Sequence, residues 1–243
     1  MQSTFKLKMS SLAIGALFAA TCAPAVMAGD PPTAATLAAN QAVLKALPFD
    51  DTRDFDDVKR GFIAPLPHDG VIKSADGAVV YDLSAFGFAA KGAAPGSVNP
   101  SLWRQAQLLS LGGLFEVAPR IYQVRSADIS NPTFIEGDTG VIVIDPVTTA
   151  ETGKVAIELY RQHRGNKPVV AVIYTHSHID HFGGVRGMID EADVKAGKVR
   201  IIAPVGFMEE VAGENVNVGN HMSRRATYQF GNLLPKGPEG SLG

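Results

Sequence analysis

One stretch of the 243-residue sequence decides the fold, and it reads Val169-Val170-Ala171-Val172-Ile173-Tyr174-Thr175-His176-Ser177-His178-Ile179-Asp180-His181-Phe182-Gly183-Gly184. Residues 169–174 are apolar and rich in β-branched side chains, which indicates a buried strand. A cluster of histidines and an aspartate follows directly, and two glycines then begin a helix. Because open α/β sheets place ligands at the carboxyl ends of their strands, the stretch predicts an α/β fold with a site at this strand end.

The elements on either side of this stretch support the same fold class. Residues 149–164 carry apolar side chains at helical spacing between two apolar strands, which is the pattern of a strand-helix-strand unit. We predict helices at 101–109, 149–164 and 182–190, helical stretches at 205–216 and 222–230, and strands at 121–125, 133–136, 141–144, 169–174 and 200–203.

The chemistry of the motif is that of a metal site. Residues two apart in an extended segment point the same way, so His176 and His178 can converge on one ion, while Asp180 and His181 can face a second. Imidazole and carboxylate suit Zn²⁺, and two ions about 3.5–4 Å apart can generate hydroxide near neutral pH. Two other interpretations stay open, a histidine-rich surface loop and adventitious metal binding without catalysis.

The first 28 residues predict a secretory signal peptide. Lys6 and Lys8 precede an apolar run at 11–20, and Val26-Met27-Ala28 offers a cleavage site after Ala28. The alternatives are a membrane anchor, for which the run is shorter than the roughly 20 residues required, and a lipoprotein signal at Cys22, whose preceding residues are atypical. We expect a periplasmic or secreted protein with no stable membrane anchor.

Composition limits the remaining classes of function. Cys22 is the single cysteine, so the mature chain can make no disulfide, and its metal ligands must be histidines and carboxylates. The formal net charge of −2 and the lack of a basic tract argue against a nucleic-acid partner. Residues 29–100 are rich in Ala, Pro and Asp and predict an extended lead-in with one strand pair at 70–73 and 78–83; residues 101–243 form the predicted catalytic part.

The motif His176-x-His178-x-Asp180-His181 resembles the signature of the metallo-β-lactamase superfamily, whose fold is a four-layer αβ/βα sandwich. Further blocks resemble the alkyl sulfatases, which are exported zinc hydrolases of detergent-like sulfate esters. These blocks are Asn99-Pro100-Ser101-Leu102-Trp103-Arg104-Gln105-Ala106, Asn131-Pro132-Thr133-Phe134-Ile135-Glu136-Gly137-Asp138-Thr139-Gly140, Ile144-Asp145-Pro146 and Met222-Ser223-Arg224-Arg225-Ala226-Thr227-Tyr228. The resemblance implies zinc-dependent hydrolysis of an alkyl sulfate ester, such as dodecyl sulfate, to alcohol and sulfate by metal-activated hydroxide.

The resemblance also assigns roles to residues of the motif. It implies that His176 and His178 bind one zinc ion and that Asp180 and His181 bind the other, with Asp180 the catalytic residue of the set. Asp145 matches an acidic residue that hydrogen-bonds near the metal loop behind the ligands; the alternative is an aspartate that simply ends a strand before a proline. His221 is the only histidine after the motif, and we interpret it as a surface residue, like His68.

The family pattern extends well past the length of this chain. Alkyl sulfatases continue for several hundred residues, through the remaining metal ligands, a dimerisation region and a lipid-carrier-like domain. We therefore expect an N-terminal portion of the catalytic sandwich with an incomplete site that holds metal weakly, and a homodimer only in the full-length protein. Two alternatives remain, another exported hydrolase of the superfamily acting on a lactam or lactone, and a catalytically incomplete truncated chain.

Overall fold

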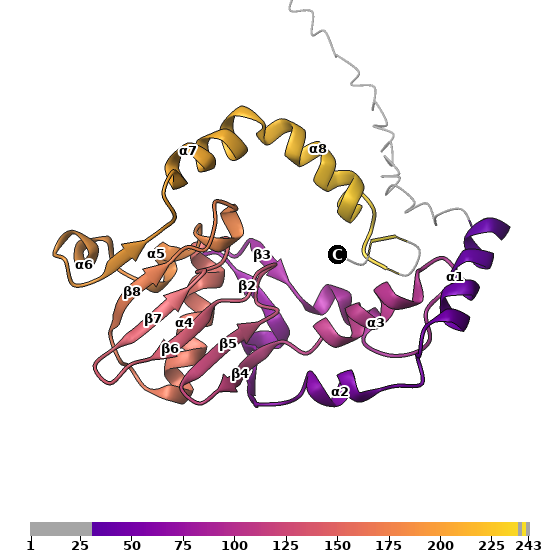
Figure 1. Ribbon diagram of the computed structural model, residues 1–243, viewed down its shortest axis with the longest axis horizontal. Coiled ribbons are helices and arrows are strands. Elements are labelled where there is room, and N and C mark those ends of the chain that lie inside the picture. The colour runs from indigo at the N-terminus through magenta and orange to yellow at the C-terminus, as the bar shows by residue number, and fades with distance from the viewer. Residues whose placement is uncertain (1–30, 238–239, 242–243) are drawn as a thin grey trace, which may run out of the picture.

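A seven-stranded sheet forms the centre of the molecule in the computed structural model, which describes residues 31–237 and 240–241 (Figure 1). The strand order is β1-β4-β5-β6-β7-β8-β9. The strands are β1 (Phe62–Pro65), β4 (Gly113–Ala118), β5 (Ile121–Arg125), β6 (Thr133–Glu136), β7 (Val141–Ile144), β8 (Val169–Ile173) and β9 (Arg200–Ile202). The predicted signal peptide at 1–28 lies outside the described residues. Among the helices that are described, none has the length and apolar character needed to cross a membrane.

The sheet changes from antiparallel to parallel at β7. Neighbouring strands from β1 to β7 run antiparallel, whereas β7, β8 and β9 run parallel to one another. The predicted strand-helix-strand unit is thereby confirmed, and β5, β6 and β7 have the predicted bounds. The parallel pairing brings the carboxyl ends of β7 and β8 side by side, with Ile144 opposite Ile173.

Helix α4 (Ala150–Arg164) covers one face of this sheet. It begins with a capping box in which Thr149 and Thr152 satisfy each other's backbone N–H groups. Its Tyr160 ring stacks on Phe134 of β6 at 4.5 Å between centroids and also contacts Tyr122 of β5. All three rings are buried, so the core lies between α4 and the sheet. In β5 and β7 buried side chains alternate with side chains that are only partly buried.

The segment before residue 100 corrects part of the prediction. The strand pair is confirmed as β2 (Val71–Lys73) and β3 (Val79–Asp82). However, the supposedly extended lead-in contains α1 (Ala34–Ala46) and α2 (Arg53–Asp57), and β1 joins the main sheet. The alanine-rich α1 buries no side chain, so it has no apolar face from which periodicity could have predicted it.

The elements after β8 differ from the prediction in their bounds: α5 (Val185–Met188) and α7 (Phe207–Ala212) are shorter than expected, whereas α8 (Gly219–Phe230) is longer. Of the helix expected at 182–190 only α5 forms; the 3₁₀ turn η3 (Ile179–His181) precedes it, and α6 (Glu191–Lys195) follows. The stretch 205–216 forms α7, and a single π-helical turn, η4 (Gly213–Asn217), leads into α8. In Figure 1, α7 and α8 form an arc above the sheet that runs from the end of β9 toward α3 (Pro100–Leu109).

Candidate metal centre

The histidine motif lies where the parallel strands end. The chain leaves β8 at Ile173, and Thr175 to His181 form a loop beside the loop that follows β7. The backbone N–H of Asp145 bonds to the carbonyl of Ile173 at 3.0 Å, which joins the two loops at their base. The motif therefore lies at the carboxyl edge of the sheet, where the sequence predicts the site.

Asp145 is the centre of the contacts between these two loops. Its carboxylate accepts hydrogen bonds from the Thr175 backbone N–H (2.8 Å) and the Thr175 hydroxyl (2.7 Å). The same carboxylate lies 2.9 Å from Nδ1 of His181. Asp145 adopts a left-handed φ of 53°, and Val147 has φ 54°, a conformation that costs free energy in residues other than glycine. The surrounding contacts hold this turn, so the Asp145 carboxylate has a fixed direction.

The imidazole rings of His178 and His181 both lie against the ring of His176. The ring centroids of His176 lie 4.6 Å from those of His178 and 4.0 Å from those of His181. Thr175 donates its single hydroxyl proton to Asp145, so its oxygen accepts from Nδ1 of His176 at 2.9 Å. Asp145 in turn accepts from Nδ1 of His181. Both His176 and His181 are thus left with an unshared electron pair on Nε2.

Asp180 and His181 provide the observation that tests whether a metal fits. His181 Nε2 lies 3.1 Å from Asp180 Oδ2. Because the His181 proton is on Nδ1, the two atoms meet as two acceptors, an arrangement that requires either a second proton on the ring or a cation between them. The donor types fit zinc. In residues 31–237 and 240–241, however, no three His, Cys, Asp or Glu side chains are arranged around one ion; the donors meet in pairs.

Glu214 of η4 is a member of this cluster that the sequence did not reveal. Its Oε1 lies 2.8 Å from Nε2 of His178, and its Oε2 accepts from the Ser177 hydroxyl at 3.3 Å. No spacing rule connects it to a motif that lies more than 30 residues earlier in the sequence. His221 and His68 are exposed, and His221 contacts Arg224. Their exposure agrees with their interpretation as surface residues.

A cleft of about 530 Å³ opens beside the motif. His178, Asp180 and Glu214 lie on its polar side, and its apolar lining comes from Ile179, Val216, Met222 and Ala226. The cleft therefore places a hydrocarbon surface next to the imidazoles and carboxylates.

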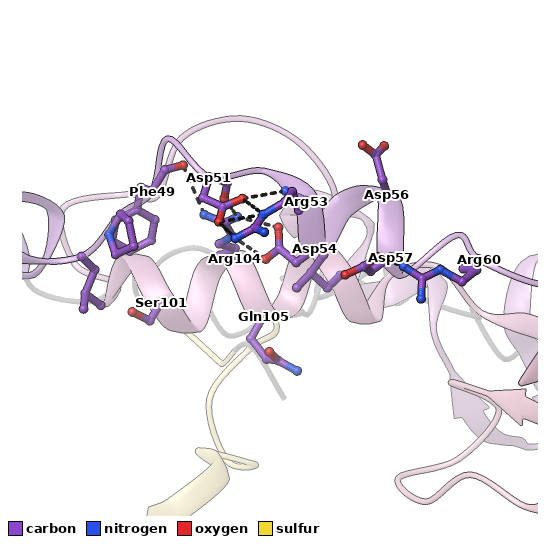
Figure 2. A pocket seen from close by; sticks show the side chains of 13 residues that line it. Phe49, Asp51, Arg53, Asp54, Asp56, Asp57, Arg60, Ser101, Arg104 and Gln105 are labelled. Carbon is purple, nitrogen blue, oxygen red and sulfur yellow. Dashed lines mark hydrogen bonds and ion pairs between the residues drawn. The ribbon is translucent and has the colours of Figure 1, made fainter.

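A larger cleft of about 900 Å³ lies between the α1–α2 segment and α3 (Figure 2). Arg104 of α3 bonds to Asp54 at 2.7 Å, donates to the carbonyl of Phe49 at 3.2 Å, and lies over the Phe49 and Phe55 rings. The hydrogen bond with Arg104 lowers the pKa of the Asp54 carboxyl. Each arginine of this cleft pairs with an aspartate, so the cluster joins the first two helices to α3 and gives no indication of a ligand.

Comparisons with known proteins show which proteins this chain is similar to. Residues 125–241 match the family model described as the metallo-beta-lactamase superfamily. A linear primary-alkylsulfatase of a Pseudomonas species is 58% identical over 88% of this chain and 32% of its own length. An alkyl/aryl-sulfatase of Saccharomyces cerevisiae is 52% identical over 85% of this chain and 32% of its own length.

A solved structure shows the same fold. The stereoselective inverting sec-alkylsulfatase of a Pseudomonas species superposes with a TM-score of 0.79 and 56% identity, over 86% of this chain and 33% of that one. The chain thus spans about a third of the length of the relatives it matches, and the predicted α/β fold is confirmed as part of a metallo-β-lactamase-type sulfatase structure. We conclude that the chain belongs to the metallo-beta-lactamase superfamily and is a homologue of the alkylsulfatases.

Proposed function

We propose that the protein hydrolyses alkyl sulfate esters in a zinc-dependent reaction, with His176, His178, Asp180 and His181 as metal ligands. The observation that carries this proposal is the pair formed by His181 Nε2 and Asp180 Oδ2 at 3.1 Å. Two acceptors at this distance need a proton or a cation between them, and the set of imidazole and carboxylate donors in the motif supports the cation. The homology to alkylsulfatases, at 52% to 58% identity in three relatives, supports the choice of substrate class.

The residues of the chain have separate tasks in this proposal. Zinc, when bound, supplies Lewis acidity that makes water acidic near neutral pH and neutralises negative charge that develops on the ester. Asp145 and Thr175 hold the protons of His181 and His176 on Nδ1 and so direct Nε2 of both rings toward the ion. Asp180 brings a negative charge to the same place, which strengthens cation binding.

The cleft beside the motif suits an amphiphilic substrate. An alkyl chain can lie against Ile179, Val216 and Met222 while the sulfate group reaches the histidines. Burial of a hydrocarbon chain contributes about 0.8 kcal/mol per methylene group, so longer alkyl sulfates are expected to bind more tightly.

We also propose that residues 1–28 direct the protein to the periplasm or the cell exterior.

The first part of the test measures metal content. Zinc per chain is determined after dialysis for the wild-type chain and for H176A, D180A and the exposed-site control E210A. Because the incomplete site is expected to hold metal weakly, the dialysis buffer contains a fixed concentration of free zinc, and we expect more zinc on the wild type and E210A than on H176A and D180A. Equal zinc content in all four proteins would overturn the assignment of the site.

The second part measures turnover. Because the chain spans only a third of its relatives, it is inserted in place of the corresponding segment of the 58% identical Pseudomonas alkylsulfatase. We expect this chimaera to release sulfate from dodecyl sulfate, and the D180A chimaera to release none. Turnover of a cephalosporin or a lactone in place of dodecyl sulfate would instead assign the chain to another hydrolase class of the superfamily.

A further inference from the structure

Each histidine ring of the motif is fixed through one of its two nitrogens. Thr175 contacts Nδ1 of His176, and Asp145 contacts Nδ1 of His181. His178 differs, because its contact with Glu214 is made through Nε2. Metal-binding histidines almost always donate the N–H that faces away from the metal to a carboxylate, a carbonyl or water. The partner of His178 therefore decides which of its nitrogens can bind an ion.

Glu214 is held in place by elements on both sides of it. On its amino-terminal side, Phe207 of α7 packs against the rings of Tyr174 and Phe182, at 5.4 Å in each case. On its carboxyl-terminal side, the N–H of Val218 bonds to the carbonyl of Gly213 at 3.1 Å and closes the π-helical turn. Single π-helical turns occur frequently at functional sites, where they redirect one side chain. Here that side chain is Glu214, which is only 24% exposed.

We propose that Glu214 is a positioning residue of the metal site, which fixes the ring of His178 with its proton on Nε2 and its electron pair on Nδ1. A carboxylate can only accept, so the ring nitrogen that faces it carries the proton. The Ser177 hydroxyl occupies the second oxygen of the same carboxylate and limits its rotation. His178 would then bind metal through Nδ1, while His176 and His181 bind through Nε2. This inference rests on the proposed metal site.

The structure favours this role over direct coordination by Glu214. Both carboxylate oxygens of Glu214 already have partners, one on His178 and one on Ser177. Glu214 contacts one histidine and one hydroxyl group of the motif loop, in the same way as Asp145 contacts His181 and Thr175.

The first experiment determines the position of the proton directly. The metal-free chain is labelled with ¹⁵N-histidine, and the tautomer of His178 is measured by NMR at about pH 8.5, where an ordinary imidazole is neutral. The His178 signals are assigned with H178N. We expect the proton on Nε2 in the wild type and in E214Q, whose amide oxygen still accepts, and a mixture of tautomers in E214A. A proton on Nδ1 of wild-type His178 would overturn the proposal.

The second experiment measures zinc affinity by competition with a chromophoric chelator. We expect E214A to bind roughly 10–100-fold more weakly than the wild type, E214Q to recover most of the loss, and the exposed-site control E210A to bind like the wild type. Far-UV circular dichroism shows whether each variant is folded, and E214Q serves as the conservative variant if E214A is not.

The two proposals fail in different ways. If the wild-type chain binds zinc and folded E214A binds it equally well, the role of Glu214 is refuted and the metal site stands. If the wild-type chain takes up no zinc at all, the proposed function and the role of Glu214 fall together.

Discussion

Asp145 shows how much of the site depends on one side chain. It adopts a left-handed conformation with φ 53°, which an aspartate tolerates better than most residues but which still costs free energy. In return its carboxylate accepts from two donors of Thr175 and contacts His181. The strained turn after β7 is thereby the support for the loop after β8.

Replacement of Asp145 by alanine is expected to damage metal binding more than the fold. The change leaves His181 free to rotate and to change tautomer, so zinc affinity should fall roughly 10–100-fold. Loss of three polar contacts at a 13% exposed side chain should lower the free energy of unfolding by about 1–3 kcal/mol. Chelator competition and urea unfolding measure the two effects.

The matched control for this prediction is D138A. Asp138 pairs with Arg120 at the surface, and its side chain is 91% exposed, so the change should leave zinc affinity unaltered and stability within about 0.5 kcal/mol. Wild-type zinc affinity in D145A would contradict the supporting role of Asp145.

Asp128 is a second aspartate whose side chain supports the loops near the site, and it lies outside every motif. Its carboxylate, 6% exposed, accepts from the Thr148 N–H and hydroxyl at 3.1 and 2.6 Å and from the Thr152 hydroxyl at 2.6 Å. These contacts fix the start of α4 directly after the Asp145 turn. Nothing in the local sequence distinguishes Asp128 from a loop aspartate, since its partners come from another element.

At the scale of elements, the metal loop is held against the start of α4 by close backbone contact. A Cβ atom on Gly184 would lie 2.3 Å from the carbonyl oxygen of Pro146, and one on Gly183 would lie 2.2 Å from that of Thr148. Both distances are far below van der Waals contact. The two glycines after the motif are therefore required by the approach of η3 and α5 to the loop between β7 and α4.

A methyl group at Gly184 is expected to push these elements apart. We predict that G184A lowers the free energy of unfolding by about 1–3 kcal/mol, as overpacking does, and weakens zinc binding because the loop moves. G87A is the matched control, since a Cβ atom there meets no neighbour within 4 Å. Urea unfolding and chelator competition test both variants, and a fully stable G184A would show that the backbone can adjust without cost.

At the scale of the whole molecule, the sheet is covered unequally. Tyr122, Phe134 and Tyr160 fill the space under α4, while the alternate residues of β5 and β7 remain partly exposed. Helices α7 and α8 form the arc seen in Figure 1, and no side chain of α8 is buried. The contacts of this arc with the rest of the molecule include the stacking of Phe207 on Tyr174 and the pair of Glu214 with His178. The Ser241 hydroxyl in the tail donates to the carbonyl of Phe230.

The buried tyrosines predict a loss of stability in alkali. Burial, with a smaller contribution from the charge of Asp128, raises the pKa of Tyr81 to about 12, and burial also raises the pKa of Tyr174. In the unfolded chain the same phenols lose their protons near pH 10. Above that pH the native state binds more protons than the unfolded state, so the stabilisation is complete below about pH 10 and is lost as the pH rises toward 12.

Urea unfolding at about pH 8 to 11.5, together with phenolate absorbance, tests this prediction. The free energy of unfolding should fall above about pH 10, and Y81F should show a shallower fall because one of the shifted groups is gone. A free energy that stays constant up to about pH 11.5 would contradict it.

The sequence by itself determined the elements whose signal is local. The strands at 121–125, 133–136 and 141–144, helix α4 and the position of the motif after β8 follow from side-chain periodicity and capping chemistry. Within the motif, His176, His178, Asp180 and His181 are close in sequence, so their closeness in space needed no tertiary information. Helix α1 escaped prediction because it buries no side chain and so leaves no periodic pattern.

Only the tertiary structure decided which groups surround the motif. Asp145 was predicted near the metal loop from the family resemblance, but Asp128 and Glu214 were not, and they reach the loops at the sheet edge from separate elements. The parallel pairing of β7 with β8 and the packing of Phe207 bring these elements together. Contacts between residues distant in sequence depend on how whole elements pack. Local propensity carries no record of that packing, so the sequence could propose the candidate ligands and Asp145, while the contacts of Asp128 and Glu214 could not be predicted from it.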